Sequence, residues 1–130
     1  MAGDSITIVL VEDNDVFRES LELLLDTVPD MQVVAAVADG RRAVELCERL
    51  KPDVVLMDYR LPELDGVETT AAIREACPTS AVVVLTAVAE SEEIDALYAA
   101  GAVACLTKDR ELGEIVGAVR AAAGRGAALR

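Results

Sequence analysis

Five polar side chains of complementary chemistry each follow a short apolar run of this sequence. They are Glu12, Asp13, Asp58, Thr86 and Lys108. An unbroken apolar run is typical of a strand buried on both faces, so each of these residues stands where a buried strand ends. In an open parallel sheet the carboxyl ends of the strands lie along one edge, where ligand sites collect. We therefore expect the five side chains to meet at one edge of a sheet.

The three carboxylates in this set predict a cation site. Two carboxylates about 5 Å apart repel each other by roughly 3 kcal/mol at an effective dielectric of about 20, so packing alone does not explain three of them. A divalent cation among them removes that repulsion. Oxygen ligands with room for water and phosphate suit Mg²⁺ better than zinc or iron.

The other two side chains extend this chemistry to phosphoryl transfer. Lys108 brings a mobile positive charge and Thr86 a hydroxyl donor, which together with Mg²⁺ would neutralise and bind phosphoryl oxygens. Asp58 would then be the nucleophile that forms an acyl phosphate. Each residue alone has a simpler interpretation: an acid that ends a strand or caps the next element, an ion pair between Lys108 and Asp58, and an ordinary Thr at a strand end. Their coincidence at matching strand ends favours the phosphoryl site.

Strands and helices alternate along the 130 residues, which is the pattern of one α/β domain. The apolar runs predict strands at 6–11, 32–38, 54–58, 81–85 and 102–106. Such a pattern gives a doubly wound parallel sheet with helices on both faces and right-handed crossovers. A chain this short fits five strands in the order 2-1-3-4-5, the flavodoxin-like order, in which the first and third strands flank the switch point.

The helices between these strands carry apolar stripes and polar residues that cap them. The stripes are Phe17, Leu21, Leu24, Leu25 and Val28 in the first helix, Ala43, Leu46, Cys47 and Leu50 in the second, Ile94, Leu97 and Tyr98 in the fourth, and Leu112, Ile115, Val116 and Val119 in the last. Asn14 or Asp15 is expected to cap the first helix, and Asp65 to open the third with a capping box. Ser91 and Asp109 are expected to cap the fourth and fifth helices.

The composition excludes several classes of protein. The net charge is −12 and the sequence pI is about 4.3, so this domain is not expected to bind nucleic acid or an anionic membrane. The chain contains no histidine, which removes Ser-His-Asp catalysis, His-ligated zinc and a phosphohistidine carrier. Its three cysteines lie within apolar patterns and are expected to be reduced core residues of a cytoplasmic protein. No apolar run reaches the length of a membrane span, and the N-terminus shows no secretory signal.

The sequence resembles the receiver domain of bacterial two-component response regulators over about its whole length. The matching stretches are Val11-Glu12-Asp13, Met57-Asp58-Tyr59-Arg60-Leu61-Pro62, Asp65-Gly66-Val67-Glu68, Leu85-Thr86-Ala87 and Leu106-Thr107-Lys108-Asp109. The Arg60-Leu61-Pro62 loop and the Lys108-Asp109 pair are most similar to the subgroup with a LuxR-type helix-turn-helix output domain. The resemblance implies a receiver domain over residues 1–124. Residues 125–130 would begin a linker to an output domain that binds DNA and regulates transcription.

The resemblance also implies a role in phosphorelay signalling. Asp58 would accept a phosphoryl group from the phosphohistidine of a sensor histidine kinase. Mg²⁺ would be bound by Asp13, Asp58 and the backbone carbonyl of Arg60, and by Glu12 through a water. A domain of this kind is a phosphoacceptor and not an enzyme, and the resemblance allows a homodimer on phosphorylation.

The same resemblance assigns the phosphoryl-binding residues and reveals one departure. Lys108, Thr86 and the backbone amide of Ala87 would hold the phosphoryl group. In the family, an aromatic residue three positions before the lysine turns inward as the Thr moves toward the phosphate. That position is Cys105 here, so we expect normal phosphorylation but weak conformational switching across the fourth helix, fifth strand and fifth helix. Tyr98 is an alternative source of a ring, although a half-buried core residue is the simpler interpretation of that position.

Three other functions compete with this one. A Mg²⁺-dependent phosphatase with an Asp nucleophile typically has a second acid two residues later, where this chain has Arg60. A degenerate receiver that only binds other proteins is disfavoured because all five site residues are present, although Cys105 keeps that alternative open. A flavodoxin-like cofactor binder needs rings to stack a flavin, and aromatic residues make up only 2% of the chain.

Overall fold

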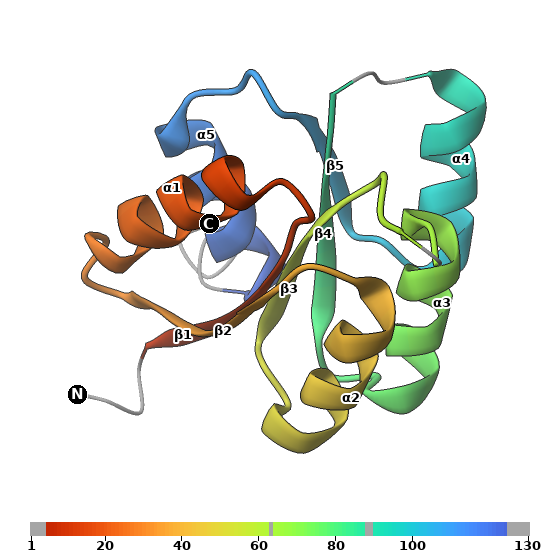
Figure 1. Ribbon diagram of the computed structural model, residues 1–130, viewed down its shortest axis with the longest axis horizontal. Coiled ribbons are helices and arrows are strands. Elements are labelled where there is room, and N and C mark those ends of the chain that lie inside the picture. Colours follow the sequence, from red (N-terminus) through yellow and green to blue (C-terminus); the bar gives the residue numbers. More distant parts are fainter. Residues whose placement is uncertain (1–4, 63, 88–89, 125–130) are drawn as a thin grey trace.

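The computed structural model describes residues 5–62, 64–87 and 90–124. A parallel five-stranded sheet lies between two layers of helices (Figure 1). The strands are β1 (Ile6–Val11), β2 (Met31–Val37), β3 (Val54–Asp58), β4 (Ala81–Thr86) and β5 (Ala104–Thr107). The helices are α1 (Asp15–Asp26), α2 (Gly40–Leu50), α3 (Gly66–Ala76), α4 (Ser91–Ala100) and α5 (Leu112–Ala122). The strand order is β2-β1-β3-β4-β5 with every neighbouring pair parallel, which confirms the predicted order.

Alternation of side chains along the strands divides the core into two apolar clusters, one on each face of the sheet. In β1, Ile6, Ile8 and Leu10 pack with α1 and α5, whereas Val9 and Val11 pack with α2, α3 and α4. The central strands β3 and β4 alternate in the same way, with Val54, Leu56, Val83 and Leu85 on the first face and Val55, Met57, Val82 and Val84 on the second. Because both faces are covered, these strands read as unbroken apolar runs in the sequence.

Three of the helices begin at side-chain caps that satisfy their free amides. The Asn14 carboxamide oxygen accepts from the Phe17 amide at 2.9 Å, so Asn14 rather than Asp15 caps α1. The Asp39 carboxylate accepts from the Arg42 amide and caps α2. Asp65 opens α3 with the predicted capping box. Each such cap contributes about 1 kcal/mol and fixes where the preceding loop ends.

Two predicted caps are wrong. Glu90 precedes α4 and Glu111 precedes α5, and neither of these residues makes a side-chain capping bond. Ser91 is instead the first residue of α4. Asp109 accepts a hydrogen bond from the Thr107 hydroxyl at 2.5 Å, and this local bond holds it in the loop before α5. Ser and Asp side chains form local hydrogen bonds in loops as readily as they cap helices. Sequence alone therefore did not distinguish the two uses.

The structure also corrects the limits of some predicted elements. Strand β5 begins at Ala104 rather than at residue 102, because the Ala102 amide donates to the Leu97 carbonyl and closes α4. Leu24, Leu50 and Tyr98 lie at the solvent edge of their helices and are 46%, 42% and 47% exposed. The predicted linker at 125–130 lies outside the described residues. Over the parts that are described, no helix combines the length and apolar character needed to cross a membrane.

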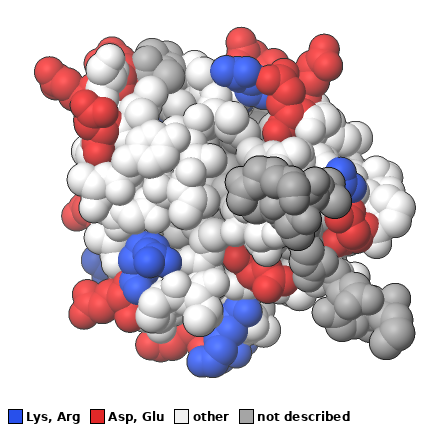
Figure 2. Space-filling model, turned by 180° about the vertical axis from the view of Figure 1, so that it is seen from behind, with Lys and Arg blue, Asp and Glu red and all other residues white. Residues whose placement is uncertain are grey.

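The face opposite to the view of Figure 1 carries acidic and basic side chains in small mixed groups around an uncharged middle (Figure 2). Acidic groups predominate in the whole chain, which has 24 Asp and Glu against 12 Lys and Arg. No continuous positive patch is visible on this face among the residues drawn.

Helix α3 begins so close to the loop after β3 that Gly66 has no room for a side chain. Its amide donates to the Tyr59 carbonyl at 2.8 Å, and an added Cβ would lie 2.9 Å from Tyr59 Cα. We expect Gly66→Ala to lower the free energy of unfolding by about 1–3 kcal/mol, because the neighbour is backbone and must move.

Gly113→Ala is the matched control, because an added Cβ there meets nothing within 4 Å. On the exposed side of α5 this change should raise stability by up to about 1 kcal/mol through helix propensity. Urea unfolding of both variants measures the difference. Equal free energies of unfolding of the two variants would show that the close approach at Gly66 does not affect stability.

Candidate functional site

Three of the predicted site residues come together at the carboxyl edge of the sheet, on the side covered by α1 and α5. Asp58 continues the alternation of Val54 and Leu56, which face this side, and Glu12 continues that of Leu10. Lys108 follows β5, whose Leu106 packs toward the same side. The period of two along each strand therefore directs these three side chains toward one another.

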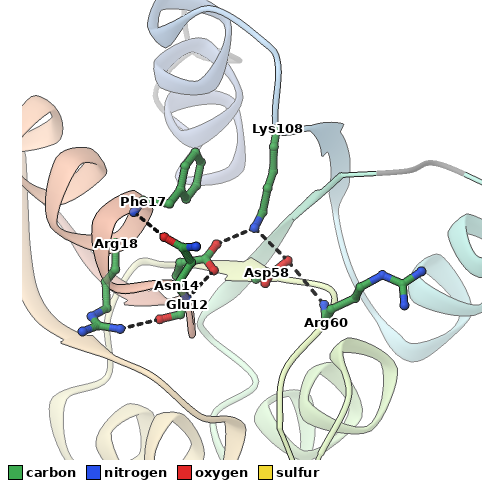
Figure 3. A network of polar contacts seen from close by, with 7 residues as sticks. All are labelled: Glu12, Asn14, Phe17, Arg18, Asp58, Arg60 and Lys108. Atoms are coloured by element: carbon green, nitrogen blue, oxygen red, sulfur yellow. Dashed lines mark hydrogen bonds and ion pairs between the residues drawn. The ribbon is translucent and has the colours of Figure 1, made fainter.

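Lys108 links the two buried carboxylates of this edge (Figure 3). Its Nζ lies 2.7 Å from Glu12 Oε1 and 3.3 Å from Asp58 Oδ1. Its backbone amide donates to the Thr86 carbonyl at 2.8 Å, which fixes the start of the side chain at the end of β4. The ion pair anticipated between Lys108 and Asp58 is present, but the shorter contact of the ammonium is to Glu12.

Glu12 is held at both carboxylate oxygens and at its backbone. Its Oε2 accepts from the Asn14 amide at 2.9 Å, while Oε1 accepts from Lys108. The Arg18 guanidinium donates to the Glu12 carbonyl at 2.8 Å and also pairs with Asp15 at 2.7 Å. The end of β1 and the first turn of α1 are therefore one hydrogen-bonded unit.

The three acids predicted to bind a cation are grouped as expected. Carboxylate oxygens of Glu12, Asp13 and Asp58 lie within 4.8 Å of one another. Glu12 and Asp58 are 2% and 5% exposed, whereas Asp13 is open to solvent. Three oxygen ligands with one side open to water match the preference of Mg²⁺, which keeps part of its hydration shell when bound to protein.

The electrostatics of the site favour an added cation. Burial raises the pKa of Asp58 to about 6, and the charge of Glu12 adds to the rise. The Lys108 charge and the Arg60 amide, which donates to Asp58 Oδ1 at 3.3 Å, act in the opposite direction. Burial alone would lower the pKa of Lys108, but its bonds to Glu12 and Asp58 outweigh that effect and raise the pKa. Lys108 is therefore charged, and one ammonium faces three acids.

The remaining predicted residues lie around this group. Thr86 is the buried last residue of β4, and Ala87 follows it in the exposed loop. Arg60 contributes its amide to Asp58, while its side chain is exposed. Cys105 is half-buried in β5 and packs with the second apolar cluster, on the opposite side of the sheet from Lys108. Asp58 and Lys108 therefore lie on the opposite side of the sheet from Cys105, whereas Thr86 continues the alternation of Val82 and Val84 on the side of Cys105.

Tyr98, which is on α4, lies beside Cys105, which is on β5. Burial raises the pKa of the Cys105 thiol, and a hydrogen bond with the Tyr98 hydroxyl opposes the rise. Tyr98 is 47% exposed and belongs to neither apolar cluster, so it lies at the solvent edge of α4 and not in the core as the sequence suggested. Tyr98 therefore occupies the neighbourhood of the missing aromatic side chain without filling the core beneath it.

Two residues of the site were not anticipated. Phe17 was predicted only as part of an apolar stripe, yet its ring lies 4.8 Å from Lys108 Nζ. Arg18 had no predicted role and holds the end of β1 to α1. Both residues follow the acidic cluster within the first turns of α1, and that proximity in sequence is the signal that points to them.

Comparison with known proteins identifies the family. Residues 8–120 match the family described as the response regulator receiver domain. The chain belongs to this family. DegU from Brevibacillus brevis, a transcriptional regulatory protein, is 35% identical over 124 residues, which are 95% of this chain and 52% of DegU. The chain spans about half the length of the curated relatives it matches.

Solved structures agree with this membership of the receiver family. The signal receiver domain of NarL from Mycobacterium tuberculosis has a TM-score of 0.89 and 33% identity, over 93% of this chain and 98% of that chain. The receiver domain of the sensor histidine kinase PA1611 from Pseudomonas aeruginosa PAO1 has a TM-score of 0.82 and 34% identity, over 92% and 98%. That receiver was solved with a magnesium ion coordinated in its active site cleft.

Proposed function

We propose that this receiver accepts a phosphoryl group on Asp58 from the phosphohistidine of a sensor histidine kinase. The observation that carries the proposal is the placement of the buried Asp58 carboxylate between the Lys108 ammonium and the Arg60 amide. An Asp58 oxygen attacks phosphorus, the bond from phosphorus to the donor nitrogen breaks, and its electron pair returns to the imidazole. The product is an acyl phosphate on Asp58.

The chain's own residues would prepare this reaction by position and charge. Lys108 would exchange its contact with Asp58 for a phosphoryl oxygen, while Glu12 continues to hold the ammonium. Thr86 and the Ala87 amide, at the end of the adjacent strand, would donate to the other phosphoryl oxygens. Phosphoryl transfer needs little more from a protein than such positioning and charge neutralisation.

Mg²⁺ is the cofactor that the acids fit. Asp13, Asp58 and the backbone carbonyl of Arg60 would bind it, with Glu12 acting through a water. The grouping of the three carboxylates, the solvent access at Asp13 and the magnesium bound by the PA1611 receiver support this assignment. When bound, the ion would offset the negative charge that the phosphoryl group brings to the acidic edge.

An intact-mass measurement tests the phosphoacceptor function directly. The protein is incubated with acetyl phosphate and Mg²⁺, and a gain of one phosphoryl group is expected. No mass gain with either acetyl phosphate or a phosphorylated kinase would leave a degenerate receiver that only binds partners. Repeated turnover of a phosphomonoester would instead favour the phosphatase alternative, which Arg60 disfavours because it stands where such an enzyme has a second acid.

The role of the whole protein follows from its relatives. DegU is a transcriptional regulatory protein about twice as long as the matched region. We propose that this receiver likewise controls a separate DNA-binding output domain, and that the predicted homodimer on phosphorylation is part of that control.

The three cysteines among the described residues are free, which supports the cytoplasmic location proposed for such a regulator.

Weak conformational switching is the prediction that follows from Cys105. Its side chain is too small to fill the space that an aromatic residue would occupy as Thr86 moves toward the phosphoryl group. With beryllofluoride as a mimic of the acyl phosphate, we expect small changes in amide exchange over residues 91–124. Cys105→Tyr should enlarge these changes and leave labelling of Asp58 unaltered. A wild-type response as large as that of Cys105→Tyr would contradict the prediction.

A further inference from the structure

The Lys108 ammonium has a third neighbour besides the two carboxylates. The face of the Phe17 ring lies 4.8 Å from Lys108 Nζ, measured to the ring centroid. In Figure 3 the ring stands beside the lysine stem on the α1 side, with Glu12 and Asp58 beyond the ammonium. A cation within about 6 Å of an aromatic centroid is attracted by the negative face of the ring.

The position of this ring is fixed by the same contacts that build the site. The Phe17 amide donates to the Asn14 side chain, and the Asn14 amide donates to Glu12 Oε2. Arg18, the next residue, holds the Glu12 carbonyl. The ring itself lines a shallow apolar pocket between α1 and α5, together with Leu24. Phe17 is thus tied to the residue that receives the lysine's shortest ion pair.

We propose that Phe17 is a positioning residue for Lys108, and that its ring keeps the ammonium over the acidic edge during phosphoryl transfer. The inference rests on the phosphoacceptor function proposed above. The lysine side chain has four rotatable bonds and is 22% exposed, so it needs contacts that persist when Asp58 becomes an acyl phosphate. The ring persists through that change. Because it is uncharged, it attracts the ammonium without competing for it as a third carboxylate would.

A packing role is the alternative, in which the ring only fills the pocket between α1 and α5. The two roles differ in what they require of the side chain. Packing requires size and apolar character, whereas attraction of a cation requires electron density on the ring face. Fluorination withdraws that density with little change in size, so it separates the two roles.

The chain is well suited to this experiment because it has a single phenylalanine. Replacing phenylalanine by fluorinated analogues therefore alters Phe17 alone. The rate of labelling by acetyl phosphate is measured for rings with one, three and five fluorines. We expect a stepwise slowing that reaches about fivefold with pentafluorophenylalanine, as for loss of a partly shielded cation–ring contact. Phe17→Tyr, which keeps an electron-rich ring, should retain the rate, and Phe17→Leu should slow labelling to the same extent as full fluorination.

Leu24→Ala is the matched packing control. Leu24 lines the same pocket as Phe17 and Lys108 and is 46% exposed, but its aliphatic side chain has no ring face to attract the ammonium. This change should leave the rate of labelling unaltered. Equal rates across the fluorinated series, or slowing by Leu24→Ala as large as that of the fluorinated rings, would overturn the inference while leaving Asp58 as the phosphoacceptor.

A second readout does not depend on phosphorylation. A para-fluoro ring at Phe17 should shift its fluorine resonance when Lys108→Met removes the charge, in protein that has no phosphodonor. An unchanged resonance would show that the ring does not sense the ammonium, and the inference would fail even if labelling by acetyl phosphate succeeds. A shifted resonance in a protein that is never labelled would support the contact and reject the proposed phosphoacceptor function instead.

Discussion

Asp58→Asn is expected to abolish the mass gain that acetyl phosphate and Mg²⁺ produce in the wild-type protein. The amide has almost the shape of the carboxylate, so the fold is kept, but it lacks the nucleophilic oxygen that forms the acyl phosphate. Intact-mass spectrometry over a time course measures the phosphorylated fraction. Asp58 is the buried acid that both Lys108 and the Arg60 amide contact, whereas Glu12 is held by Lys108 and the Asn14 amide.

Asp95→Asn is the control for this experiment, since it makes the same chemical change at an exposed position on α4. It should be labelled like the wild type. Labelling of Asp58→Asn to the wild-type level would show that the phosphoacceptor is another residue. Circular dichroism of both variants shows whether a loss of labelling reflects chemistry or unfolding.

Mg²⁺ is expected to stabilise the wild-type protein and to have little effect on Asp13→Asn. An ion that binds only the folded state raises the melting temperature by mass action, here by roughly 5–15 °C at a hundredfold excess over its dissociation constant. Asp13 is the solvent-exposed member of the acidic group, so Asp13→Asn removes a ligand without emptying a buried position. The same variant should be labelled more slowly than the wild type.

Asp109→Asn supplies the comparison, because Asp109 is an exposed acid next to Lys108 but is not part of the acidic group. Its melting temperature should rise with Mg²⁺ as in the wild type. Sodium chloride at equal ionic strength separates binding from general screening. The assigned ligand set is wrong if Asp13→Asn gains as much stability from Mg²⁺ as Asp109→Asn does.

The order of the strands and the meeting of the acids could be predicted because both follow from short-range patterns. Apolar runs marked the buried strands, and their alternation directs Glu12, Asp58 and Lys108 to one side of the sheet. The capping box at Asp65 is likewise a local pattern that the structure contains. Receiver membership of the chain was also predicted, from the short stretches around these residues, and the family match over residues 8–120 confirms it.

What the sequence did not reveal depends on contacts between distant elements. Nothing local to Lys108 indicates that its ammonium lies nearer to Glu12 than to Asp58, because that choice depends on how β5 and α1 are placed. The contact between Lys108 and Phe17 joins residues 91 positions apart in sequence. Ser91 shows the opposite failure, since a residue with good capping chemistry does not cap α4 when the helix begins one residue earlier and includes it as the first helical residue.

The distance in sequence between Glu12 and Lys108 has a consequence during protein synthesis. The carboxylates of β1 and β3 emerge first, and the lysine that faces them is joined only after β4 and β5 have been made. Until β5 pairs with β4, a nascent or truncated chain has the acids without their ammonium. Under the proposed function, a chain would have to complete the sheet before Lys108 could help Asp58 to accept a phosphoryl group, so partly synthesised copies would not take phosphoryl groups from the kinase.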